Sequence, residues 1–444
     1  MPTRKKLWPS DCVIWGTCKG MGRTVFFGID GLSHTMWRDL ADSGVMPQSA
    51  QLIKESQLVP MRSAIPEVSS VAWTSMVTGK NPGGHNVFGF TDIPDNSYTL
   101  AFTSARTVKA PPFWQMEGWG PSLVMNVPQT YPAQPLDGTL VAGYVALDLA
   151  KAVYPAARLP VFEEVGYDID VEMALAWTSP DRFFAELTRI LEARSAALDI
   201  LWSQADWQTI AFIITGTDRL NHYFLDHYEQ EGALRERFLD FYSSVDAALG
   251  DMVARLADDD VLVVVSDHGF ELQEKVVNVN HVLKEAGLLV LDDGPRVTPA
   301  SMQPESKVFA MDPGRLYLHR SDRYPKGQVG PGDESLLAKI SELFTGFRHE
   351  GKPIVERIEL GKDLYDGPFS YRAPELVLMP AQGVSFSGRL KSDGLLEDSY
   401  IVGKHTLEDA VFLCRSPNAV DLPEAMTVFD VLPAMNAARE GIVE

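Results

Sequence analysis

The sequence predicts a layered α/β/α fold with a mostly parallel central sheet and an inserted cap. Three observations carry this prediction: apolar runs of strand length, polar or glycine-containing residues directly after each run, and stretches of helical length and spacing between the runs. The runs are continuously apolar rather than alternating, which indicates strands buried on both faces, as in parallel sheets. Strands that alternate with helices are typical of the α/β class.

The predicted strands follow one another along most of the chain. They are expected at residues 24–29, 122–126, 209–214 and 261–265, with the longest helices at 180–203 and 234–257. Three strands lead into polar segments that contain Asp30, Asp218 and the pair Asp267-His268. Because ligands of open α/β sheets bind beyond the carboxyl ends of the strands, these residues are candidates for a functional site.

The domain organisation predicted from the pattern is one large domain, residues 21–444, preceded by a tail. Residues 1–20 are polar and contain two prolines, so we expect a disordered N-terminal tail, with an upstream start-site extension as the alternative. Between about 290 and 400 the chain has Pro- and Gly-rich connections and only short segments. We expect a cap over the strand ends within 290–400, with 142–170 as a second candidate segment.

The composition limits the classes of partner. The chain of 444 residues is 45% hydrophobic and 22% charged, which is typical of a globular protein and excludes disordered and fibrous classes. Its 60 acidic and 39 basic residues give a formal net charge of -21. Such a surface repels phosphates, so we expect neither nucleic acid nor a membrane as a partner. An anionic substrate would need a local positive group, and a bound metal ion is the simplest one.

Cysteine usage and hydropathy predict a cytoplasmic protein. The three cysteines, Cys12, Cys18 and Cys414, do not form a disulfide framework, which favours a reducing compartment. No apolar run reaches the roughly 18 residues of a membrane span, and the first twenty residues lack the apolar core of a signal peptide.

Two short motifs combine carboxylate and imidazole groups. Asp218 and His222 are four residues apart, so a helix would place both on one face, where they could share a metal. Taken alone, such a pair is better explained as a surface ion pair or a helix cap. Asp267 and His268 follow a buried strand and are the stronger ligand pair, with a polar turn as the alternative. The other candidates of this kind are Asp30 and His405.

Ser69 and Ser70 open a predicted helix that ends near Gly79. The free N–H groups and the positive dipole at a helix N-terminus favour an oxyanion or a phosphate. A serine hydroxyl that contacts a divalent cation can ionise and act as a nucleophile. For an isolated serine pair, a simple N-cap role is the alternative.

Taken together, these residues resemble the alkaline phosphatase superfamily, in particular its type I phosphodiesterase/nucleotide pyrophosphatase branch. The resemblance runs from Thr24 to Glu440 and implies an alkaline phosphatase-like core. It rests on Gly28-Ile29-Asp30-Gly31, Ser69 with Trp73 through Gly79, Asn81 through His85, Asn126 through Pro132, Asp218 with His222, Ser266 through Gly269, Val277 through Asn280, and Gly403-Lys404-His405.

The resemblance implies a site with two divalent metal ions. One ion would be held by Asp30, Asp267, His268 and the Ser69 oxygen, and the other by Asp218, His222 and His405. Ser69 takes the position of the nucleophile because it lies ten residues before Gly79, where family members carry Thr or Ser. Three imidazoles favour zinc, with manganese next. The implied mechanism is attack by Ser69 on phosphorus, a covalent phosphoserine, and hydrolysis by water.

The expected function is a metal-dependent phosphodiesterase or phosphohydrolase that cleaves a small phosphate ester or a nucleotide-type diphosphate. Nucleotide-cleaving relatives bind a phosphoryl oxygen through an asparagine, but Phe90 occupies that position by counting. Asn86, Asn126 and Thr130 are therefore the candidate substrate-binding residues, with an ordinary turn role as the alternative for Thr130. The sulfatase pattern is missing, which disfavours sulfate esters.

Two other functions are compatible with the same residues. A phosphoryl transferase or mutase would pass the phosphoryl group from the serine to an alcohol, and a non-catalytic metal-binding protein would only hold the ions. The sequence leaves the oligomeric state open, with a homodimer as one option.

Overall fold

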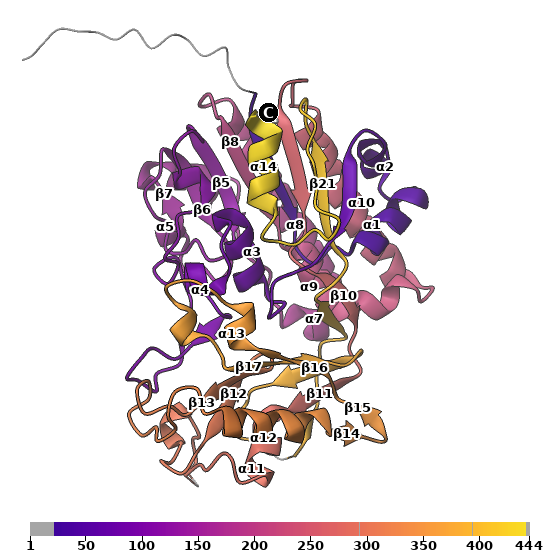
Figure 1. Ribbon diagram of the computed structural model, residues 1–444. Helices are drawn as coiled ribbons and strands as arrows, with labels where there is room; N and C mark the ends of the chain where they lie inside the picture. The colour runs from indigo at the N-terminus through magenta and orange to yellow at the C-terminus, as the bar shows by residue number, and fades with distance from the viewer. Residues whose placement is uncertain (1–21, 293, 393, 441–444) are drawn as a thin grey trace, which may run out of the picture.

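The computed structural model describes residues 22–292, 294–392 and 394–440, which form a large and a small lobe (Figure 1). The predicted tail, residues 1–20, lies outside the described residues. The large lobe is built on an eight-stranded sheet. In order across the sheet, the strands are β2 (Gln57–Met61), β21 (Ala410–Arg415), β9 (Val261–Val265), β1 (Thr24–Ile29), β8 (Thr209–Ile214), β5 (Ser122–Val127), β6 (Gly138–Ala142) and β7 (Val153–Tyr154).

The central strands of this sheet are parallel, which confirms the predicted class. β9, β1, β8, β5 and β6 pair in parallel, whereas β2, β21 and β7 are antiparallel to their neighbours. Every residue of β1 is buried, and its side chains alternate between two apolar clusters. Val25 and Phe27 belong to one cluster and Phe26 to the other. Residues 25–29 are continuously apolar because the side chains on both faces of β1 are buried, each face against its own apolar cluster.

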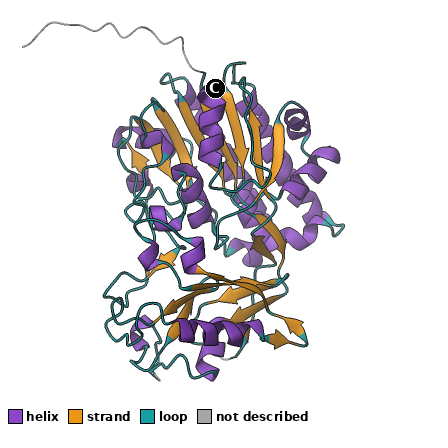
Figure 2. Cartoon of the chain, viewed as in Figure 1, coloured by secondary structure: helices purple, strands orange, loops and turns teal. Residues whose placement is uncertain are grey.

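Helices cover both faces of the large sheet (Figure 2). One face packs against α1 (His34–Asp42), α2 (Pro47–Lys54), α8 (Pro180–Trp202) and α10 (Ala233–Val253), and the other against α3 (Ser69–Thr78) and α14 (Val431–Glu440). The predicted helices at 180–203 and 234–257 are confirmed as α8 and α10, although α10 ends four residues early. Among the described residues, no helix is both long and apolar enough to cross a bilayer.

The small lobe has its own sheets and its own apolar cluster. Its larger elements are β11 (Lys275–Asn278), α11 (Val279–Glu285), β12 (Val308–Met311), β13 (Arg315–Leu318), α12 (Glu334–Thr345), β16 (Val355–Leu360), β17 (Leu376–Pro380), β18 (Val384–Ser387) and β19 (Leu396–Glu397). It begins at β11, before the expected cap at 290, because β11 and α11 carry no Pro or Gly signal. Residues 142–170 pack instead on the large lobe, where β7 pairs with β6 and Phe162 joins the apolar cluster of α8.

Short elements make the connections between these parts. They are α4 (Pro82–His85), β3 (Thr91–Asp92), β4 (Ala101–Phe102), α5 (Leu149–Ala152), α6 (Leu159–Glu164), α7 (Leu175–Thr178), α9 (Gly216–Phe224), β10 (Gly269–Leu272), β14 (Arg348–His349), β15 (Lys352–Pro353), α13 (Gly361–Leu364) and β20 (Gly403–Thr406), with the 3-10 helices η1 (Phe113–Gln115), η2 (Ala156–Arg158), η3 (Leu225–Tyr228), η4 (Pro299–Ser301) and η5 (Ser370–Arg372).

The helix α3 is buried along its whole length although half of its residues are polar. The hydroxyls of Thr74, Ser75 and Thr78 each donate to the carbonyl four residues earlier, at 2.6, 2.8 and 2.6 Å. These bonds satisfy hydroxyls that burial would otherwise leave without partners. The helix ends at Gly79, whose φ of +62° is left-handed and favours glycine.

His85 ties α3 to α4 as a neutral imidazole. Its Nδ1 accepts from the backbone N–H of Val87 at 3.1 Å, so the proton lies on Nε2, 3.0 Å from the Ser75 hydroxyl. Burial lowers the pKa of His85 to about 3. A second proton would therefore both charge a buried ring and remove the acceptor of Val87.

The stability of the protein is expected to fall with acid because of this histidine. The pKa of a histidine in the unfolded chain is about 6.5. Below that pH the unfolded chain binds a proton at His85, whereas the folded chain does not. The free energy of unfolding then loses about 1.4 kcal/mol for each pH unit from about pH 6.5 down to about pH 3. Denaturant unfolding of the native protein and of His85→Gln across this range measures the difference. An equal acid dependence in both proteins would contradict the prediction, and His349→Gln controls for the loss of a histidine elsewhere.

Candidate metal centre and active site

The structure brings the seven predicted metal-ligand residues together at one edge of the large sheet. Asp30 follows β1, and Asp267 and His268 follow β9. Asp218 and His222 lie on α9 after β8, and His405 lies on β20, which pairs with β10. Ser69 is the first residue of α3. These elements meet because β1, β8 and β9 are adjacent parallel strands whose carboxyl ends share one edge.

Asp218 lies at the centre of the three imidazoles. Its Oδ1 is 3.2 Å from Nε2 of His405, 3.4 Å from Nε2 of His222 and 3.9 Å from Nε2 of His268. Asp267 Oδ2 is 3.2 Å and Asp30 Oδ1 3.8 Å from the same His268 nitrogen. Two compact groups result, Asp30 with Asp267 and His268, and Asp218 with His268 and His405, each within 4.8 Å. The two groups share His268.

All three imidazoles are oriented alike by backbone carbonyls. Nδ1 of His222 lies 2.9 Å from the Gly403 oxygen, Nδ1 of His405 2.8 Å from the Glu67 oxygen, and Nδ1 of His268 3.2 Å from the Gly269 oxygen. A carbonyl only accepts, so each Nδ1 carries a proton and each Nε2 points to the centre of the cluster, where a neutral ring presents a lone pair. The Nε2 atoms of His222 and His405 are 3.0 Å apart. Two facing lone pairs repel unless a cation lies beside them, which fits a metal site.

The carboxylates also fit a cation. One buried oxygen of Asp30, of Asp218 and of Asp267 has no hydrogen-bond partner among the described residues. Burial, followed by the charges of Asp267 and Asp218, raises the pKa of Asp30 well above its usual range. Burial also opposes ionisation of Asp218, but the charges of His222, Arg219 and His405 outweigh it and hold the pKa of this carboxyl well below its usual range. Unpaired, buried carboxylate oxygens are costly, and divalent cations remove that cost.

The ionisation of the imidazoles agrees with a ligand role for His222. Burial lowers the pKa of His222 to about 4, so the ring is neutral near neutral pH. Burial also opposes protonation of His268, but the adjacent Asp267 carboxylate raises the pKa of this ring above its usual value. An imidazole binds a metal ion through an unprotonated nitrogen. A cation at Nε2 of His268 would therefore compete with protonation of that nitrogen.

Neighbouring groups fix the orientation of the carboxylates. The Trp73 ring N–H donates to Asp30 Oδ2 at 2.9 Å, and the Gly31 N–H donates to Asp267 Oδ1 at 3.1 Å. Each bond leaves the other oxygen of its carboxylate for the cluster. Gly31 has a φ of +69°, and a Cβ there would lie 2.4 Å from the Phe270 ring. Only glycine therefore fits between the two strand ends.

Arg219 holds Asp218 from the other side. Its guanidinium contacts Asp218 Oδ2 at 2.5 Å and Asp170 Oδ2 at 2.7 Å, and it stacks 4.5 Å from the centre of the Tyr144 ring. The guanidinium can occupy one oxygen of Asp218 while Oδ1 faces the imidazoles. Asp170 balances the charge of Arg219, so the pair positions the carboxylate without adding net charge.

Ser69 lies beside the cluster at the start of α3. Its hydroxyl oxygen is 3.3 Å from His268 Nε2. The N-cap of α3 is Val68, and no side chain caps the helix. The N-cap interpretation of Ser69 and Ser70 is therefore wrong. The backbone N–H groups of Ser69 and Ser70 bond no other described residue, so they are free to bind an oxyanion.

The three predicted substrate-binding residues each bond to protein groups, although one buried oxygen of Asn126 has no partner among the described residues. Asn126 is buried at the end of β5 and donates to the Ile213 carbonyl at 3.2 Å. Asn86 donates to the Thr107 carbonyl and accepts from Arg372. The Thr130 hydroxyl donates to the Val127 carbonyl at 2.6 Å. A pocket beside His222 and His405, described next, opens on the cluster, and none of the three residues lines it. Their contact with a substrate therefore stays a prediction.

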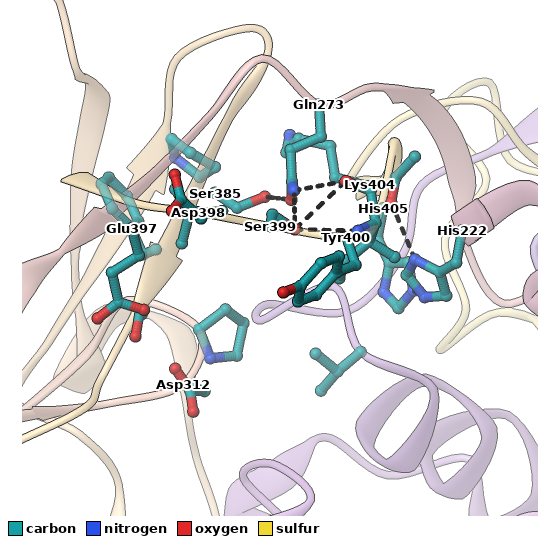
Figure 3. Close-up of a pocket in the computed structure, with 18 of the residues that line it drawn as sticks. His222, Gln273, Asp312, Ser385, Glu397, Asp398, Ser399, Tyr400, Lys404 and His405 are labelled. Carbon is teal, nitrogen blue, oxygen red and sulfur yellow. Dashed lines mark hydrogen bonds between the residues drawn. The ribbon is translucent and has the colours of Figure 1, made fainter. Parts of the chain in front are cut away.

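A pocket of about 520 Å³ opens beside His222 and His405, between the two lobes (Figure 3). Its aromatic lining is Trp177, Tyr223, Phe386 and Tyr400, none of which the sequence identified. Tyr400 lies in a polar segment without periodicity, and Trp177 lies on the four-residue helix α7. Neither segment is long enough to show a period, so nothing in the sequence pointed to these two rings. Arg219 was missed although it is adjacent to Asp218.

Comparison with known proteins agrees with this geometry. Residues 24–408 match the family described as type I phosphodiesterase / nucleotide pyrophosphatase. Comparison with curated protein sequences gave no match.

Solved structures share the fold at low sequence identity. Phosphonoacetate hydrolase from Sinorhizobium meliloti 1021 in complex with phosphonoformate has a TM-score of 0.64 and 16% identity, covering 94% of this chain and 96% of that chain. Murine ectonucleotide pyrophosphatase / phosphodiesterase 5 has a TM-score of 0.53 and 14% identity, covering 93% of each chain. An inactive form of the murine protein in complex with AMP has a TM-score of 0.53 and 13% identity, covering 94% of this chain and 95% of that chain. The match over residues 24–408 shows that the chain belongs to the type I phosphodiesterase/nucleotide pyrophosphatase family and is a phosphoester hydrolase.

Proposed function

We propose that this chain hydrolyses a small phosphate ester with Ser69 as the nucleophile and with two divalent metal ions at the cluster. The observation that carries the proposal is the position of the Ser69 hydroxyl, 3.3 Å from the imidazole that both ligand groups share. Asp30, Asp267 and His268 would hold one ion, with the Ser69 oxygen facing it. Asp218, His222 and His405 would hold the other.

The bound ions would supply positive charge that favours the ionised Ser69 oxygen and offsets the negative charge of the phosphoryl group. Three imidazole ligands favour zinc, with manganese as the alternative. The chain's own contribution is orientation: the carbonyls of Gly403, Glu67 and Gly269 fix the rings, and Trp73 fixes Asp30. The free N–H groups of Ser69 and Ser70 would donate to phosphoryl oxygens.

Hydrolysis of the ester would proceed by two successive displacements at phosphorus. In the first, the Ser69 hydroxyl loses its proton, its oxygen forms a bond to phosphorus, and the bond from phosphorus to the leaving oxygen breaks. The leaving alcohol takes up the one proton that Ser69 has released. In the second, water attacks the phosphoserine and the bond between phosphorus and the Ser69 oxygen breaks. One proton of the water returns to Ser69, and the remaining OH leaves with the phosphate. In-line displacement of this kind depends on positioning and charge rather than on strong covalent chemistry. The small lobe would act as the cap that holds the leaving group.

Mass spectrometry of the Ser69 peptide tests the proposal directly. Native protein loaded with zinc or manganese and quenched in acid during turnover of an aryl phosphate ester should carry one phosphoryl group on Ser69. Metal analysis of the same sample should give about two ions per chain. Turnover without any phosphoserine at Ser69 would refute the covalent mechanism. Turnover in the presence of an alcohol separates the outcomes, since a transferase forms the new ester and a hydrolase releases phosphate.

A further inference from the structure

The pocket beside His222 and His405 carries more acidic than basic side chains. Its charged lining comprises the carboxylates Glu67, Asp312, Glu397 and Asp398 and the cations Arg389 and Lys404. Both cations already have carboxylate partners, because Lys404 lies 2.8 Å from Glu271 and Arg389 lies 3.4 Å from Glu397. Asp312, Asp398 and Glu67 form no ion pair among the described residues. The pocket therefore keeps three carboxylates without a cation.

Glu67 is the most informative of these carboxylates. It is only 7% exposed, and its side chain makes no hydrogen bond or ion pair with the described residues. Its backbone carbonyl binds His405, and it lies two residues before Ser69. Its carboxylate faces the pocket, where water or a cationic ligand can contact it. Glu67 thus places negative charge at the end of the pocket that adjoins the reacting serine.

Aromatic faces line the same pocket. Trp177 and Tyr400 stack with ring centres 5.7 Å apart and an angle of 26° between the planes, and Tyr223 lies 5.6 Å from Trp177. Trp177 is 51% and Tyr400 78% exposed, among the most exposed large apolar side chains described. In Figure 3 the Tyr400 ring projects between the histidines and the side of the pocket that carries Asp312 and Glu397. An exposed aromatic face next to carboxylates is a setting in which a cation binds by cation–π attraction.

We propose that this pocket binds the alcohol part of a phosphate ester that carries a fixed or protonated amine. The inference rests on the proposed function, in which the phosphoryl group lies at the cluster. The anionic phosphoryl group would face the metal ions, and the cationic alcohol would face the carboxylates and the aromatic pair. A second phosphate, as in a nucleotide diphosphate, would meet uncompensated carboxylates instead, so the pocket disfavours such leaving groups.

A pair of isosteric esters tests the charge preference. Phosphocholine and 3,3-dimethylbutyl phosphate have the same shape and differ in one positive charge. Calorimetry compares the binding of the two esters to zinc-loaded Ser69→Ala protein. Release of inorganic phosphate compares their turnover by native protein, with the alcohol as the leaving group in both. In both measurements we expect phosphocholine to be favoured by at least about tenfold, which corresponds to about 1.4 kcal/mol.

Variants of the pocket show whether these residues carry the preference. In the double variant Tyr400→Ala with Asp398→Asn, the preference should fall by at least about threefold. Tyr371→Ala is the matched control, because Tyr371 is also an exposed tyrosine but does not line the pocket, and it should keep the full preference. Equal binding and turnover of the two alcohols by native protein, or an unchanged preference in the double variant, would overturn the proposal. Failure of the native protein to cleave any ester, with the binding preference intact, would refute the proposed function instead.

Discussion

Replacement of Ser69 by alanine is expected to lower the turnover of aryl phosphate esters by at least about three orders of magnitude. The substitution removes the only hydroxyl that lies within 3.3 Å of the shared imidazole, His268, among the described residues. The fold should be retained because Ser69 contributes no hydrogen bond to a helix cap and fills no apolar volume. Steady-state kinetics of the metal-loaded variant and its thermal unfolding midpoint are the measurements.

Ser70→Ala provides a matched control for this prediction. Ser70 is the next residue of α3, it is fully buried, and its hydroxyl has no partner among the described residues. Removal of an unpartnered buried hydroxyl costs little and can stabilise a protein. We therefore expect turnover within a few-fold of native and an unfolding midpoint at or above that of the native protein. The nucleophile assignment would be contradicted if Ser69→Ala kept more than about one tenth of native turnover. It would also be contradicted if Ser70→Ala lost more turnover than Ser69→Ala.

The layers of the fold could be predicted because the central strands are buried on both faces. Such strands cannot alternate polar and apolar residues, so β1, β8 and β9 are visible in the sequence, and the polar residues after them must emerge at one edge of the sheet. Asp30 and Asp267 follow directly from this reasoning. The strand-end argument does not depend on the resemblance to a family, which added the order of the motifs and the division into two metal sites.

His405 and the pocket could not be derived from periodicity. His405 lies in the four-residue strand β20, which is paired with β10 through contacts between residues more than 130 positions apart. Tyr400 and Trp177 come together in the same way, from a polar connection and a one-turn helix. Short elements carry too few residues to show a period, and only tertiary packing decides which of them meet. The same limit explains why Asn126 and Thr130, whose side chains bind backbone carbonyls, looked like free polar groups in the sequence.

Asp218→Asn is expected to lower the metal content from about two ions to about one per chain and to lower kcat/KM by about a thousandfold. Asp218 Oδ1 lies within 3.9 Å of the Nε2 atoms of all three imidazoles, so its charge is the main negative group between them. An amide of the same shape keeps the packing and removes that charge. Metal analysis after dialysis and kinetics on the same sample measure both effects.

Asp170→Asn is the control for Asp218→Asn, because Asp170 binds the other side of Arg219 and contacts none of the imidazoles. It should keep two ions and most of its activity. Excess zinc should restore part of the turnover of Asp218→Asn by mass action, since the remaining ligands still bind the ion weakly. It should not restore Ser69→Ala, because that variant lacks the nucleophile, which added zinc cannot replace, as well as one predicted ligand atom. Two ions and near-native kcat/KM in Asp218→Asn would mean that the metal ions bind elsewhere, and zinc rescue of Ser69→Ala would mean that another group attacks phosphorus.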